Sequence, residues 1–116
     1  MSDNTRNALE NFEAQFKKST LPLLVLSVLS EGDMYAYEIS QVVLQRSNGI
    51  YKMPLLYTTL KKLTEQGYLL SKDPVTTEDN RTRVYYHITS DGLKYLETLK
   101  NLYFSMVQVV QEIVYK

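Results

Sequence analysis

The spacing of the apolar residues changes at Gly67, and this change limits what the chain can fold into. Before Gly67 the apolar residues recur three or four positions apart, which is typical of helices that bury one face. After Gly67 a short stretch alternates apolar and polar residues, which is typical of a β-hairpin. The rest of the chain returns to the helical spacing. The sequence therefore predicts a mainly α fold with a small β-hairpin.

The most apolar predicted helix is Leu21–Ser30, in which apolar residues occur almost all round. Such a helix belongs in the centre of a core. Ser19 and Thr20 precede it and can cap its start, while Pro22 is tolerated in a first helical turn, where no backbone donor is lost. We therefore expect a helix to begin there, separate from an earlier helix over Thr5–Lys17.

The next predicted helix is Met34–Gln45, with Asp33 as its cap. Ile39, Val42 and Val43 are expected to face the core, and Tyr37 is expected to join them. A break at residues 47–49 and a short extended piece then lead to another helix. Two helices joined by a loop of several residues have the spacing of a helix-turn-helix.

The helix after this loop is predicted over Pro54–Tyr68, with Gly67 as its stop signal. Its buried stripe is Leu56, Leu60 and Leu63. The free side carries hydrogen-bonding and charged groups, namely Tyr57, Thr58, Lys61, Lys62 and Glu65. Such a face can contact a nucleic-acid groove, with the lysines near phosphates and the tyrosine and threonine hydroxyls near phosphates or base edges. The alternative is a solvated helix face.

The predicted hairpin consists of strands over residues 68–71 and 82–88, joined by a polar turn over residues 72–80. Asn80 in this turn tolerates a left-handed backbone conformation. Arg81 and Arg83 stand at the base of the turn and suit phosphate or minor-groove contact. The alternative is that they balance Glu78 and Asp79. Three helices followed by a hairpin predict a winged helix-turn-helix.

The last predicted helix begins at its cap, Thr89, and runs to about Val114. Some 25 residues extend about 38 Å, which is longer than one side of so small a domain. We therefore expect this helix to pack against a second copy of the chain, together with the N-terminal helix. The residues expected at this dimer interface are Phe12, Leu93, Leu96, Leu99, Met106, Val110 and Ile113. The predicted units are residues 1–18, 19–88 and 89–116.

Composition restricts the classes of function. The formal net charge is zero, so DNA binding would rest on where the cations are placed rather than on a bulk positive field. The chain has no cysteine and a single histidine, and it lacks a phosphate-binding glycine loop, so we expect neither an enzyme nor a metal or cofactor site. His87 is expected to be an ordinary surface group. Without a signal peptide or a membrane-length apolar run, a cytoplasmic location is expected.

Four segments resemble the PadR family of bacterial transcriptional regulators, especially the small members with one C-terminal dimerisation helix. They are residues 23–32, 34–39, 56–63 and 81–89, the last followed by Gly92. The chain departs from the family pattern at Ala36, Met53, Leu55 and Asn80. Met53 leaves the start of the fourth helix without a capping side chain, which costs about 1 kcal/mol and can move that start.

The resemblance implies a dimeric winged-helix repressor that grips a two-fold-related DNA operator and is released by an aromatic or drug-like small molecule. It also places Tyr103 at an effector pocket between the subunits. Tyr35 and Tyr37, at the start of the helix over Met34–Gln45, are expected near backbone phosphates. Four cations per subunit, Lys61, Lys62, Arg81 and Arg83, would give a dimer a salt slope of about −7. The alternative is a protein-interaction or ligand-sensing module that does not bind DNA alone.

Overall fold

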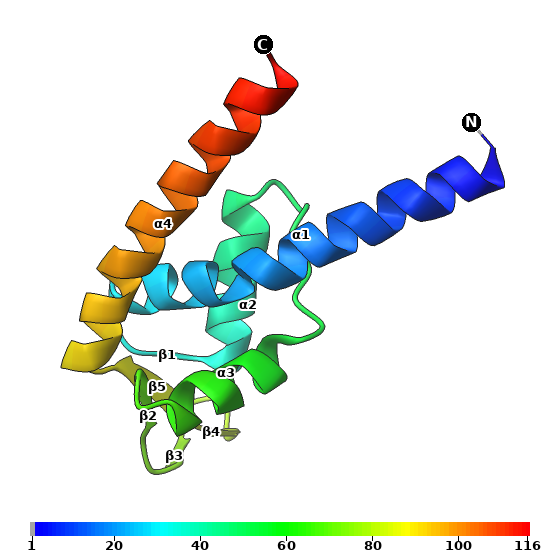
Figure 1. Cartoon of the computed structure of the whole chain (residues 1–116). Helices are drawn as coiled ribbons and strands as arrows, with labels where there is room; N and C mark the ends of the chain where they lie inside the picture. Colours follow the sequence, from blue (N-terminus) through cyan, green and yellow to red (C-terminus); the bar gives the residue numbers. More distant parts are fainter. Residues whose placement is uncertain (1) are drawn as a thin grey trace.

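A computed structural model describes residues 2–116 and shows a winged helix-turn-helix from which a long helix projects at each end (Figure 1). The helices are α1 (Asp3–Leu29), α2 (Ala36–Arg46), α3 (Leu56–Glu65) and α4 (Ser90–Val114). The strands are β1 (Met34–Tyr35), β2 (Leu69–Ser71), β3 (Val75–Thr76), β4 (Thr82–Arg83) and β5 (Tyr85–Ile88). The predicted fold class is confirmed.

Helix α1 is continuous, so the prediction of two separate helices before residue 31 is wrong. The Thr20 hydroxyl does not cap a new helix. It contacts the Phe16 carbonyl and lies 2.6 Å from the Tyr51 hydroxyl, which belongs to the loop before α3. The Ser19 hydroxyl also donates to the Phe16 carbonyl. Pro22 therefore lies inside the helix rather than in its first turn.

The two halves of α1 have different surroundings. The C-terminal half crosses the middle of the domain, where Val25, Leu26 and Leu29 are fully buried, as its all-round apolar pattern predicted. The N-terminal half extends away from the domain (Figure 1) and leaves Phe12 and Phe16 uncovered. The predicted boundary between residues 18 and 19 falls within this one helix.

Helix α2 begins at Ala36, two residues later than predicted, because Met34 and Tyr35 form β1. Asp33 is not its cap. The N-cap residue is Tyr35, whose backbone N–H donates to the Glu38 carboxylate across 3.2 Å. A β-strand directly before the helix fixes where its first turn lies.

Helix α3 begins at Leu56, two residues after Pro54, and its N-cap residue Leu55 offers no side-chain hydrogen bond. The missing cap was expected, and the first turn is instead preceded by a backbone hydrogen bond from Leu56 N–H to the Met53 carbonyl. The stripe of Leu56, Leu60 and Leu63 is buried as predicted. Gly67, with φ of +84°, allows the chain to reverse after the helix.

The sheet has the strand order β1-β5-β2, and both outer strands are antiparallel to β5. The second strand of the predicted hairpin is interrupted at Val84, which divides it into β4 and β5. Strands β3 and β4 pair in a separate two-stranded sheet. Residues 72–84, which contain this small sheet and its turn, form the wing. Asn80 in the turn has the predicted left-handed conformation, with φ of +60°.

Helix α4 begins after Thr89, whose hydroxyl accepts a hydrogen bond from the Gly92 N–H, as predicted. The Tyr95 ring stacks on Tyr68 with their centroids 4.3 Å apart and fastens the helix to the sheet. Leu96 is 4% exposed and belongs to the core of its own subunit, so its prediction as an interface residue is wrong. The far half of α4 projects from the domain (Figure 1). None of the helices within residues 2–116 is long and apolar enough to cross a membrane.

Candidate nucleic-acid interface

The free face of α3 carries the side chains that the sequence analysis assigned to it. Tyr57, Thr58, Lys61 and Lys62 are all exposed, and Tyr57 is 71% exposed. Because Leu56, Leu60 and Leu63 anchor the opposite side in the core, the orientation of this polar face is fixed. The helix therefore presents two hydroxyls and two ammonium groups to the outside.

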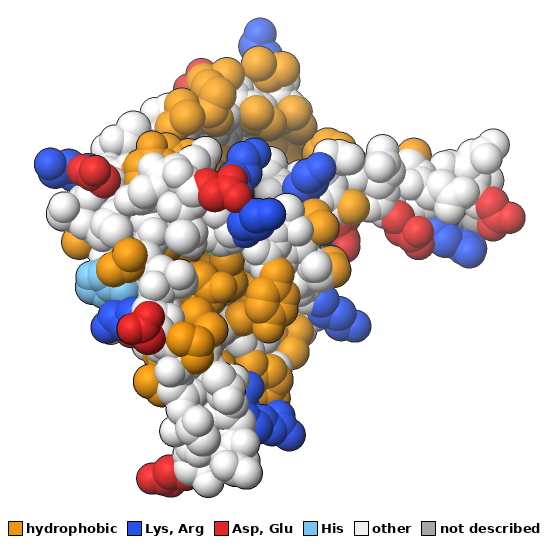
Figure 2. Space-filling model, turned by 90° about the horizontal axis from the view of Figure 1, so that it is seen from below, with side chains coloured by type: hydrophobic (Ala, Val, Ile, Leu, Met, Phe, Trp, Pro, Cys, Tyr) orange, Lys and Arg blue, Asp and Glu red, His pale blue; other side chains and the backbone are white. Residues whose placement is uncertain are grey.

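A cleft of about 220 Å³ lies between α3, the start of α2 and the wing. Its lining includes four tyrosines and one arginine, namely Tyr35, Tyr37, Tyr57, Tyr86 and Arg83. Burial raises the pKa of the Tyr86 phenol, and the neighbouring Tyr57 adds to this rise. At neutral pH the Tyr86 hydroxyl is thus protonated and available as a hydrogen-bond donor. Seen from below, the molecule has hydrophobic side chains, a class that includes tyrosine, near the middle of this face, with both cationic and acidic side chains around them (Figure 2).

Tyr37 lies on this surface and not in the core. It is 58% exposed, so the prediction that it packs beside Ile39 and Val43 is wrong. Its position two residues after the N-cap turns the ring outward, while Ala36 and Ile39 are buried beneath it. The exposed ring is free to contact a DNA phosphate, which is the other role that the sequence analysis gives to Tyr37.

Tyr35 joins α2 to the wing. The Arg83 guanidinium carbon lies 4.5 Å from the centre of the Tyr35 ring, in a cation-π contact. The Tyr85 ring meets Tyr35 edge to face, with 5.3 Å between the centroids. The Arg83 side chain is 18% exposed and its Nε atom is buried without a hydrogen-bond partner. The wing is thus held against the start of α2 through these aromatic contacts.

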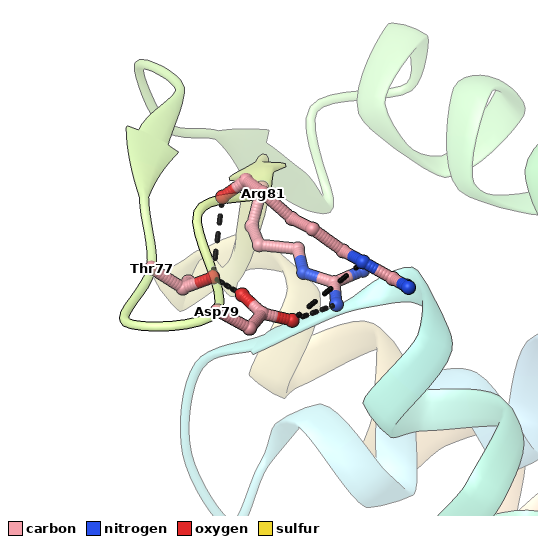
Figure 3. Close-up of polar contacts among 4 residues, drawn as sticks. Thr77, Asp79 and Arg81 are labelled. Atoms are coloured by element: carbon pink, nitrogen blue, oxygen red, sulfur yellow. Dashed lines mark hydrogen bonds and ion pairs between the residues drawn. The ribbon is translucent and has the colours of Figure 1, made fainter.

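At the tip of the wing, one carboxylate oxygen of Asp79 contacts both arginines (Figure 3). Asp79 Oδ2 is 3.2 Å from Arg83 NH2 and 3.8 Å from Arg81 Nε. The Thr77 hydroxyl donates to the same carboxylate. This hydroxyl and the nearby Arg83 guanidinium hold the pKa of Asp79 below its ordinary value. Arg81 is 72% exposed, so the two wing cations differ greatly in their access to solvent.

A second polar cluster involves residues within or next to all three strands of the sheet. Asp33 accepts hydrogen bonds from Lys72 Nζ and His87 Nδ1, at 2.5 and 2.7 Å. The Lys72 bond, and after it the His87 bond, lowers the pKa of Asp33. His87 is therefore a hydrogen-bonded surface group, as expected. The cluster ties the loop before β1 to β5 and to the start of the wing.

The far half of α4 exposes a continuous apolar stripe in the single chain. Met106, Val110 and Ile113 are each more than half exposed, and Tyr103 is 41% exposed. Leu93 is 45% exposed but lies in the first turn of the helix. Leu99 is partly buried against the core of its own subunit. On α1, Phe12 is exposed as well. Apart from Leu99, these side chains remain uncovered by the domain, as an interface would require.

The sequence analysis did not predict three features of the site. Strand β1 is only two residues long and directly precedes a helix, so the spacing of apolar residues could not reveal it. Tyr86 joins the cleft because β5 lies between β1 and β2, which depends on that missed strand. The Arg83 contact with Tyr35 joins residues 48 positions apart, and pairing at that range leaves no local sequence signal.

Residues 25–98 match the model of the Transcriptional regulator PadR-like family. An uncharacterized protein from Lysinibacillus sphaericus is 30% identical over 92 residues, which cover 78% of this chain and 84% of that protein. The structure of a transcriptional regulator from Clostridium thermocellum is similar, with a TM-score of 0.77, 29% identity and coverage of 86% of this chain and 98% of that one.

A structure of Bacillus subtilis PadR in complex with operator DNA shares the fold, with a TM-score of 0.61 and 22% identity. That match covers 69% of this chain and 46% of the other. The family match spans well over half of the present chain, from the C-terminal end of α1 to the first half of α4. The chain therefore belongs to the PadR-like family of transcriptional regulators.

Proposed function

We propose that this protein regulates transcription by binding a two-fold-related DNA operator as a homodimer, and that it is a repressor released by a small molecule. The observation that carries the proposal is the anchored α3 helix, whose Tyr57 lines the tyrosine cleft beside the wing and whose Thr58, Lys61 and Lys62 are exposed. Membership in the PadR-like family supports it. The operator complex of the B. subtilis protein shows that this fold can hold DNA.

In the proposed complex α3 enters the major groove, which is wide enough to admit a helix. Lys61 and Lys62 contact phosphates at the groove edges, and the Thr58 and Tyr57 hydroxyls reach phosphates or base edges. The tyrosine cleft receives the backbone beside the groove, where the hydroxyls of Tyr35, Tyr37 and Tyr86 would donate to phosphate oxygens. Arg81 and Arg83 reach the neighbouring backbone from the wing.

The homodimer is proposed to form through the apolar stripe on α4 and the projecting half of α1. These surfaces have too much exposed apolar area for a small soluble domain acting alone, and both lie on helices that extend beyond it (Figure 1). Two-fold symmetry would then place the α3 helices of the two subunits about one DNA helical turn, or a multiple of it, apart.

The effector is proposed to be a flat aromatic molecule bound between the subunits near Tyr103. Tyr103 is 41% exposed and lies on the same helix as the apolar stripe, so its ring is available to stack on such a molecule. An effector that binds better to the form without DNA would weaken operator affinity by that difference in affinity.

Fluorescence anisotropy tests this function directly. Labelled duplexes tiled across the DNA upstream of the coding region are titrated with the protein at two salt concentrations, with excess competitor DNA. We expect nanomolar, sequence-selective binding to one tile, with a salt slope of about −7 if all four cations of each subunit contact phosphates. Weak or equal binding to every tile at both salt concentrations would refute the proposal and favour a protein-interaction or ligand-sensing role.

A further inference from the structure

The wing turn is built so that its carboxylate faces its arginines. The Thr77 N–H donates to the Arg81 carbonyl across 2.9 Å, and the Asn80 N–H donates to the Thr77 carbonyl at the same distance. The left-handed conformation of Asn80 completes the turn. With the Thr77 hydroxyl donating to Asp79, the carboxylate is held in place before any ligand arrives (Figure 3).

This carboxylate occupies donors that a DNA phosphate would use. Carboxylate and phosphate oxygens pair with the guanidinium group in the same way. One face of the Arg83 guanidinium is covered by Tyr35, its Nε is buried, and its NH2 group already contacts Asp79. Asp79 is itself 52% exposed, so a phosphate approaching the wing tip meets arginines that are already paired.

We propose that Asp79 competes with DNA phosphates for Arg81 and Arg83, and thereby lowers the affinity of the wing for DNA of any sequence. This inference rests on the proposed DNA binding. Phosphate contacts carry no sequence information, whereas the base contacts of α3 do. If the phosphate contacts are weakened and the base contacts are unchanged, the selectivity of the protein for its operator rises.

The test uses the full chain and a duplex of random sequence, about 30 base pairs or three helical turns long. Its affinity for wild type and for Asp79→Asn is measured by fluorescence anisotropy at about 100 mM salt. The change releases two ion pairs in each subunit, and therefore four in each dimer, so we expect Asp79→Asn to bind about 3- to 10-fold more tightly. If Asp79 instead positioned the arginines for DNA, the variant would bind more weakly.

Glu78→Gln is the matched control, because it removes the same charge one residue away. Glu78 takes part in none of the ion pairs found within residues 2–116. Competition at the arginines predicts a clearly smaller gain for Glu78→Gln than for Asp79→Asn. Equal increases in DNA affinity would show that the effect comes only from the change in net charge, and would overturn the inference.

A second comparison places the change in a background that lacks both wing cations, Arg81→Gln with Arg83→Gln. There the additional gain from Asp79→Asn should disappear, and a gain that persists contradicts the competition. Thermal melting confirms that each variant is folded, and Asp79→Ser replaces Asp79→Asn if the latter does not fold. If the wild-type protein binds no duplex, both the proposed function and this inference are refuted. If the wild type binds DNA but Asp79→Asn does not bind more tightly than wild type and Glu78→Gln, only this inference is refuted.

Discussion

Gly92 lies where the first turn of α4 passes close to the Tyr68 backbone and to Ile88 of β5. A Cβ atom at this position would overlap the Tyr68 carbonyl oxygen and lie 2.8 Å from Ile88 Cγ1. Because the oxygen belongs to the backbone, it cannot turn away, and the helix would have to shift.

We therefore expect Gly92→Ala to lower the free energy of unfolding by about 2 kcal/mol, the cost typical of overpacking. Urea denaturation measures this change. Ser90→Ala, an exposed substitution in the same helical turn, should stay within about 0.5 kcal/mol of wild type. Equal stability of Gly92→Ala and wild type would show that the close approach is not rigid.

Asp33 makes stability depend on pH. Its pKa is lowered in the folded protein by hydrogen bonds from Lys72 and then His87, so the folded state favours the ionised carboxylate. The resulting stabilisation is present above the unfolded-state pKa of about 4 and is lost as the pH falls through the lower folded-state pKa.

The stability difference between wild type and Asp33→Asn should accordingly be larger at pH 7 than at pH 3. Urea midpoints of both proteins at the two pH values provide the measurement. Asp73→Asn is the control, since Asp73 takes part in none of the ion pairs within residues 2–116. If the stability difference between wild type and Asp33→Asn is the same at both pH values, the charge of the carboxylate is not its cause.

Single residues show where sequence patterns stop being informative. Helical spacing correctly identified Leu56, Leu60 and Leu63 as buried, because α3 has one apolar stripe and one neighbouring core. The same spacing cannot say which partner a residue packs against, so Leu96 was assigned to a second subunit although it packs in its own. Tyr37 was misplaced because tyrosine suits a core and a binding surface equally well.

At the scale of elements, α3 gives a test of the two lysines that are proposed to contact DNA. Replacing Lys61 and Lys62 with alanine removes about four phosphate contacts from a dimer, which should weaken binding to every sequence and reduce the salt slope by about 4. Titrations of the operator and of a random duplex at several salt concentrations measure both effects.

The control for this pair is Lys100→Ala with Lys116→Ala, which removes the same charge from the middle of α4 and from the chain end beyond this helix (Figure 1). These substitutions should leave the salt slope nearly unchanged. If the two double variants behave alike, the lysines of α3 act only through net charge.

The helices were predicted more accurately than the strands. The positions of α2, α3 and α4 follow from apolar spacing and from stop or cap residues such as Gly67 and Thr89. The continuity of α1 was missed because the Thr20 hydroxyl, a typical cap, instead meets Tyr51 from a distant loop. The break at Val84 follows from the pairing of β5 with β1 and β2, which no local pattern encodes.

At the scale of the whole molecule, the apolar stripe of α4 predicts the oligomeric state. Val110 is 55% exposed in the single chain, so Val110→Glu should leave the subunit folded. In a dimer the new carboxylate would be buried without a partner, at a cost of about 3 kcal/mol or more.

Light scattering at micromolar concentration should therefore report a dimer for wild type and a monomer for Val110→Glu. Gln108→Glu adds the same charge on the opposite, polar side of α4 and should remain dimeric. A monomeric wild type would contradict the proposed assembly, and a dimeric Val110→Glu would place the interface elsewhere.

Because α1 is continuous, a bend within it would move its whole projecting N-terminal half, here called the arm. Pro22 lacks the backbone N–H that would donate to the Lys18 carbonyl, so the helix bends most easily there. Phe12 is ten residues away, or about 15 Å, and a tilt of about 10° at Pro22 would move it by about 3 Å. In a dimer joined through such arms, a small molecule could change the separation of the two α3 helices by a few ångströms while each subunit stays folded.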